Sequence, residues 1–111
     1  MNFIKKILRK RLSQQEQIRL KFRDAFTDCV KSKFVRSALC GDAMMDGLLV
    51  YSAIANTYKI LKDNKDMQML RTLCILKDGY DPEIILKEEL TIAMKKYCGM
   101  DIDDSDIENL Q

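Results

Sequence analysis

Apolar residues recur at helical spacing along most of the chain. Ile18, Phe22 and Phe26 follow one another at intervals of four, and Cys29 and Val30 extend the same line. This spacing places the side chains on one face of a helix, whereas the two-residue alternation typical of a half-buried strand is rare. We therefore predict an all-α protein, built as an antiparallel bundle of four to five helices with an acidic C-terminal tail.

Capping residues divide the first third of this pattern. A first, basic helix is predicted over residues 2–12. Ser13 and Glu16 fit an S-x-x-E capping box and predict a second helix from residue 14. A single helix that continues across Ser13 is the alternative. The second helix is expected to reach Leu39 and to end at Gly41, because glycine suits the left-handed position after a helix.

Three further helices are expected after Gly41. Asp42 is positioned to cap a helix over 43–62, where two parallel apolar lines predict the central and most buried helix. A fourth helix is predicted over 65–77, with Met67, Leu70, Leu73, Cys74 and Leu76 as its apolar residues. Asp81-Pro82 then starts a fifth helix that runs to Cys98, because proline fits the first helical turn.

The connections between these helices are only two to four residues long, which keeps sequential helices adjacent. We therefore treat residues 1–100 as one helical-bundle domain and residues 101–111 as its tail. Within the tail, Asp104 or Ser105 is expected to cap one short final turn.

Charge is distributed unevenly over the 111 residues. Residues 1–36 carry eleven Lys or Arg and three acids, whereas residues 37–111 carry eight Lys or Arg and 14 acids. The two parts therefore have net charges of +8 and −6, which the overall charge of +2 hides. Such polarity points to a charged partner or to pairing between copies.

The basic part offers candidate binding residues for a partner protein or for phosphate. Apolar and basic positions interleave over residues 2–12, and a solvated basic helix that packs on the bundle is the simplest explanation. An acidic protein groove or nucleic-acid phosphate would also fit, whereas a membrane surface would lack a second anchor. The candidate residues are Lys5, Lys6, Arg9, Lys10, Arg11, Arg19 and Arg23.

The acidic tail combines carboxylates with apolar residues. Its acids do not form a calcium loop, since Asp106 stands where such a loop needs glycine. We expect the tail to dock on a basic helical face, either in its own chain or in a second copy. The candidate docking residues are Ile102, Asp103, Asp104, Asp106, Ile107 and Leu110.

The chemical groups of the chain argue against catalysis. Histidine is absent, and the four cysteines, Cys29, Cys40, Cys74 and Cys98, contain no C-x-x-C pair. We therefore predict no catalytic residue, no metal site, no cofactor and no small-molecule substrate. The cysteines are interpreted as reduced thiols of a cytoplasmic protein. Glu88 and Glu89 are expected on the polar side of the fifth helix.

Two hypotheses follow for the function. The first is a non-enzymatic interaction protein that self-associates, most simply as a homodimer, or docks on a larger assembly through its split-charge surface. The second is an accessory nucleic-acid-binding subunit that contacts the phosphate backbone through the basic N-terminal helices. In a combined version, the acidic tail covers the basic face until phosphate competes for it.

Overall fold

The computed structural model describes residues 13–110, and within this range the chain forms helices and no strand. The predicted all-α bundle is therefore confirmed. The predicted helix over residues 2–12 lies outside the described residues. The helices are α2 (Gln14–Lys31), α3 (Lys33–Ala38), α4 (Ala43–Asp63), α5 (Lys65–Asp78), α6 (Pro82–Cys98) and α7 (Asp104–Asn109).

Most helix starts lie where the capping residues predicted them. Ser13 has an extended backbone and accepts a hydrogen bond from the Glu16 amide at 3.2 Å, so α2 begins at Gln14. Asp42 and Asp81 accept equivalent bonds at the starts of α4 and α6. These side chains satisfy amides that have no partner within the helix.

The predicted second helix is broken at Ser32, so its expected run to Leu39 is wrong. Ser32 has ψ 148°, which ends α2, and its hydroxyl accepts from the Val35 amide at 3.3 Å, which starts α3. A serine hydroxyl competes for backbone groups in this way. Val35 is buried and anchors the short α3 helix.

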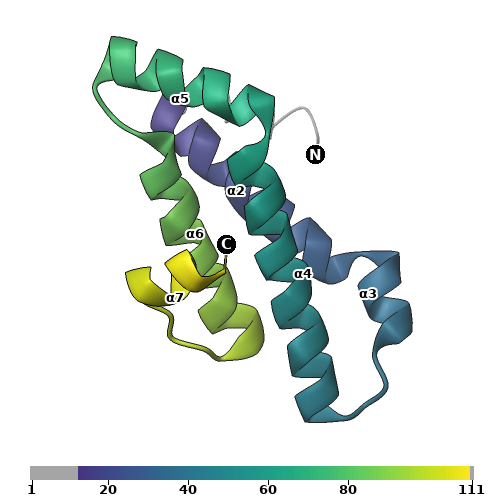
Figure 1. Cartoon of the computed structure of the whole chain (residues 1–111). Helices are drawn as coiled ribbons and strands as arrows, with labels where there is room; N and C mark the ends of the chain where they lie inside the picture. The colour runs from purple at the N-terminus through teal and green to yellow at the C-terminus, as the bar shows by residue number, and fades with distance from the viewer. Residues whose placement is uncertain (1–12, 111) are drawn as a thin grey trace.

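The core lies between α2, α4 and α6, which contact one another more extensively than any other helices of the described range. Phe22, Phe26, Tyr58, Leu90 and Met94 are its large buried side chains. The expectation that α4 is the most buried helix is wrong, since α6 buries seven residues and α4 buries three, all in its C-terminal half. The N-terminal end of α4 extends past the end of α6 (Figure 1).

The remaining helices are placed around this core (Figure 1). α5 crosses one end of the bundle, α3 lies at the opposite end of α4, and α7 lies beside α6. A helix rises about 1.5 Å per residue, so the 21 residues of α4 separate α3 from α5 by about 30 Å. Within the described range, no helix is long and apolar enough to cross a membrane.

Candidate interaction surfaces

A network of two arginines and two glutamates joins α2 to α6. Glu89 is buried, with its side chain 1% exposed, and it forms ion pairs with Arg19 at 2.9 Å and with Arg23 at 2.8 Å. Arg19 also holds Glu88 at 2.6 Å. The expectation that Glu89 lies on the polar side of its helix is therefore wrong. Its carboxylate replaces water with two guanidinium groups, which is the usual condition for burying a charge.

This network changes the electrostatic role of two predicted binding residues. Hydrogen bonds from Arg19 to Glu88 and Glu89 raise the pKa of its guanidinium, and a hydrogen bond to Glu89 does the same for Arg23. Both arginines are thus held against carboxylates of their own chain, so phosphate would have to compete with these acids. The other predicted basic residues, Lys5, Lys6, Arg9, Lys10 and Arg11, lie outside the described residues.

A groove of about 220 Å³ lies beside Glu89 between α2 and α6. Its polar groups largely satisfy one another: Glu89 is held by Arg23, and the hydroxyls of Thr27 and Tyr97 lie 3.3 Å apart. No nucleophile with an adjacent base lines it, which is what acyl or phosphoryl transfer would need. Its lining residues are Arg23, Phe26, Thr27, Glu89, Ile92, Ala93, Lys96 and Tyr97.

The predicted docking tail packs on its own chain. Asp103 and Asp106 form a capping box at the start of α7, with N–O distances of 2.9 and 3.0 Å. Ile107 is 2% exposed and belongs to the core, and Ile102 and Leu110 pack against that core. Asp104 lines a shallow depression on α6 next to Ile107. The tail thus contacts α6 through apolar side chains.

Among the residues that the structure describes, Asp101 of the tail forms an ion pair with Lys95 of α6 at 3.1 Å. Both side chains are largely exposed, so this contact contributes little to stability. Meanwhile, Arg19 and Arg23 pair with Glu88 and Glu89. Among the described residues, the carboxylates that occupy the basic face of α2 therefore come from α6.

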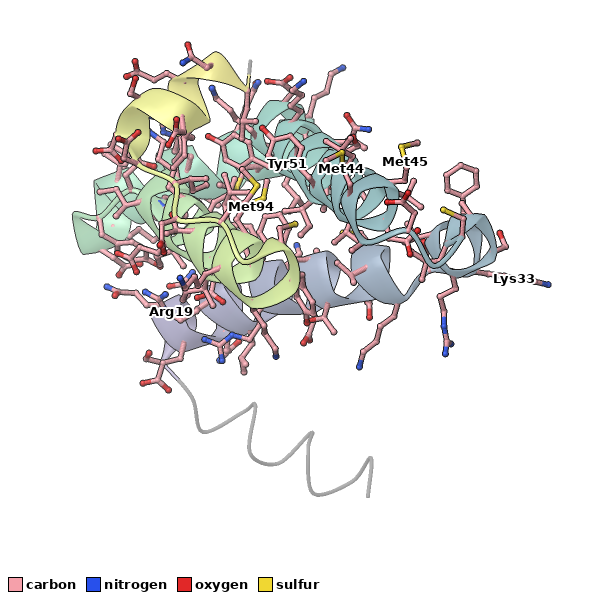
Figure 2. The ribbon with its side chains drawn as sticks, turned by 90° about the horizontal axis from the view of Figure 1, so that it is seen from below. Arg19, Lys33, Met44, Met45, Tyr51 and Met94 are labelled. Atoms are coloured by element: carbon pink, nitrogen blue, oxygen red, sulfur yellow. The ribbon has the colours of Figure 1, made fainter. Side chains whose placement is uncertain are left out.

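Large apolar side chains gather where α3 meets the N-terminal end of α4. Met44 and Phe34 are each 76% exposed, and Figure 2 shows Met44 and Met45 projecting outward from α4, with Met45 nearer to α3. Single exposed apolar residues are common on proteins, whereas several of them on neighbouring helices make a candidate interaction surface. We call this surface the apolar corner and define it as Phe34, Leu39, Met44, Met45 and Leu48.

The loop inside the apolar corner is fixed by two aspartates. Asp42 accepts from the amides of Met44 and Met45 at 2.9 and 3.2 Å, and Asp46 accepts from the amides of Cys40 and Gly41 at 2.9 and 3.0 Å. These bonds, led by that from Cys40, lower the pKa of Asp46. Gly41 has φ +85°, a left-handed conformation that strains other residues. These contacts fix the backbone of the loop between α3 and α4.

A second exposed apolar surface follows the outer side of α5. Met69 and Leu76 are strongly exposed, and Leu73 is half-exposed. Of the apolar residues named for this helix, Met67 and Cys74 are buried, whereas Leu73 and Leu76 are exposed. Arg71 fixes the helix by pairing with Asp81 at 2.8 Å and with Glu83 at 3.3 Å.

The four cysteines are free thiols in different environments. Cys74 is buried, Cys40 is exposed, and Cys29 and Cys98 are half-buried. Burial raises the pKa of both Cys29 and Cys98, which lowers the fraction of reactive thiolate. In the part of the chain that the structure describes, no three His, Cys, Asp or Glu residues are grouped to hold a metal ion.

In comparisons with known protein families, curated proteins and solved structures, nothing matches this chain.

Proposed function

We propose that this chain is a non-enzymatic interaction protein that docks on a larger protein assembly through the apolar corner. The observation that supports this best is the exposure of Phe34 and Met44, large side chains that a stable monomer would normally bury. Methionine adapts its shape to a partner, and aromatic residues contribute strongly at interface centres. The hydrogen-bonded loop favours binding, because its backbone has little conformational entropy left to lose.

The charges around the corner indicate the chemistry of the partner. Lys31, Lys33 and Arg36 are exposed at this end of the bundle, and Figure 2 shows Lys33 projecting from α3. Asp42 and Asp46 of the same end are bound to backbone amides, which leaves the basic side chains as the free charges beside the apolar centre. Free charges of one sign favour a partner of the opposite sign. The proposed partner surface is therefore an apolar segment flanked by acidic residues, such as one face of an acidic amphipathic helix.

Site-specific photocrosslinking tests this proposal. A photoreactive phenylalanine analogue replaces Phe34 in the full chain, which is expressed in its source cells and irradiated. We expect one discrete covalent adduct of higher mass, whose yield falls at least tenfold when Met44 and Met45 are both changed to Glu. The matched control carries the analogue at Ile92, a half-exposed position of α6. Absence of an adduct at position 34, or equal adducts at both positions, would contradict the proposal.

Nucleic-acid binding remains the competing proposal, because Lys21, Lys31, Lys33 and Arg36 stay exposed. Its support is weaker than that for a protein partner, since Arg19 and Arg23 are held by Glu88 and Glu89. Fluorescence anisotropy with random-sequence single-stranded RNA and duplex DNA separates nucleic-acid binding from binding of a protein partner. The measurement is made at about 50 mM salt, because electrostatic affinity for phosphate is high at low salt. A salt-sensitive binding curve would favour nucleic acid, and its absence would favour the apolar corner.

A further inference from the structure

The outer side of α5 has the spacing of a helix-pairing seam. Met69, Leu73 and Leu76 stand at i, i+4 and i+7, which is the alternation of coiled-coil core positions. All three are exposed, while Met67 and Cys74 on the opposite side of the same helix are buried in the bundle. The ion pairs of Arg71 hold the helix so that this seam faces away from the protein.

An open, shallow depression on the seam is lined by residues that include the spacing of a coiled-coil hole. It measures about 580 Å³ and is lined by Lys65, Gln68, Met69, Thr72 and Leu73. The first four residues are spaced i, i+3, i+4 and i+7, the arrangement that receives one apolar side chain of a facing helix. Leu76, which is 77% exposed one turn beyond Thr72, has the size and chemistry of the side chain that such a hole receives.

The charges beside the seam specify the direction of pairing. At about 100° per residue, Asp66 and Lys77 fall on the same flank of the seam, three turns apart. In an antiparallel pair related by a two-fold axis, equivalent flanks meet. Asp66 of one copy then lies beside Lys77 of the other, and this ion pair occurs twice. In the same alignment, Leu76 of each copy faces the depression at Lys65, Gln68, Met69 and Thr72 of its partner. The offset along the helix axis is about two residues, or about 3 Å.

We propose that α5 pairs with α5 of a second copy of this chain, antiparallel and about a two-fold axis near Thr72. A two-fold pairing closes the assembly at two copies, because the same surface serves both partners. The apolar corner lies at the far end of α4 from α5 (Figure 1), so the dimer would display two corners pointing away from each other. This proposal does not depend on what the apolar corner binds.

Sedimentation velocity of the full chain over a range of concentrations tests the pairing. We expect wild type to be a dimer and Leu76→Glu to be a monomer with unchanged helix content by circular dichroism. Met44→Glu is the matched control, because Met44 and Leu76 are almost equally exposed; this variant should remain a dimer. A monomeric wild type at concentrations on the order of 1 mM, where even weak pairs form, would overturn the proposal. A dimer that survives Leu76→Glu would also overturn it.

A charge swap tests the antiparallel register. Asp66→Lys and Lys77→Asp each place like charges together twice, so each should weaken the dimer about tenfold. The double variant D66K/K77D restores both ion pairs and should recover wild-type affinity, whereas single and double variants that are equally weak would contradict this register. A monomeric protein would contradict the α5 pairing without affecting the photocrosslinking test at Phe34. Absence of the photocrosslink would contradict the proposed function without affecting the α5 pairing.

Discussion

Removing the charge of Glu89 tests the account of the bundle interior. Glu89→Gln keeps the shape of a side chain that is 1% exposed, but it removes the carboxylate held by Arg19 and Arg23 at 2.9 and 2.8 Å. A hydrogen bond to a charged group contributes about 1.5–3 kcal/mol, so two such bonds set an upper limit of about 6 kcal/mol.

Two features of the structure reduce this limit. The glutamine carbonyl oxygen can still accept from one arginine, and the arginine side chains are 33% and 51% exposed, so water solvates the guanidinium that loses its partner. We therefore expect Glu89→Gln to lower the free energy of unfolding by about 2–3 kcal/mol. Urea denaturation followed by circular dichroism measures this as a shift of the midpoint at constant slope.

Glu88→Gln is the matched control. Glu88 pairs with the same Arg19, at 2.6 Å, but its side chain is half-exposed. An exposed pair contributes at most about 1 kcal/mol, so this variant should lose less than that. Equal destabilisation by the two variants, or a loss below about 0.5 kcal/mol for Glu89→Gln, would refute the assignment of Glu89 as a buried, doubly paired carboxylate.

Three further predictions follow from single contacts. Tyr58 is buried, and within the described range its hydroxyl has no hydrogen-bond partner, so Tyr58→Phe should raise the free energy of unfolding by about 1 kcal/mol in the same urea assay. Asp46 has a lowered pKa, so its carboxylate stabilises the loop fully above the ordinary carboxyl pKa, and this stabilisation is lost as the pH falls through the folded-state pKa. Hydrogen exchange should therefore show reduced protection of the Cys40 and Gly41 amides in acid. In the Asp46→Ala variant, the protection of these two amides should not change with pH. Ile107→Ala should lower the free energy of unfolding by about 2–4 kcal/mol, because Ile107 is buried in the core; a loss below about 1 kcal/mol would mean that α7 does not dock as described.

Helix starts were predictable from the sequence because a capping side chain acts on amides only two or three residues away. Ser13, Asp42 and Asp81 all act in this way. The same local chemistry operates at Ser32, where the signal was present but weak: no acidic residue follows in the first turn of α3. The continuous apolar pattern therefore suggested one helix across the break.

The partners of each apolar face were not predictable, because periodicity defines a face without saying what covers it. The apolar lines of α4 and α5 are as regular as that of α6, yet Met44, Leu48, Leu73 and Leu76 remain exposed. Glu89 shows the reverse case: it is buried only because Arg19 and Arg23, about 70 residues earlier in the chain, fold against it. Such contacts depend on the tertiary arrangement of helices.

The candidate surfaces were therefore only partly visible in the sequence. Charge polarity directed attention to the basic residues, but two of these, Arg19 and Arg23, are held by internal acids. The apolar corner was missed because Met44 and Leu48 belong to a line whose later members are in the core. A consistent helical period hid the change from buried to exposed halfway along α4.

The central claim is that the apolar corner binds a partner protein. The most direct test is an NMR measurement of the methionine methyl signals in the labelled full chain. Met44 and Met45 lie on this surface, and Met94 is fully buried. On addition of unlabelled extract from the source cells, we predict that the Met44 and Met45 methyl signals shift or broaden far more than the Met94 signal. When the same extract is added to the Met44→Glu variant, the methyl signals of its remaining methionines should stay at their free positions. Met44 and Met45 signals that stay at their free positions would contradict the central claim.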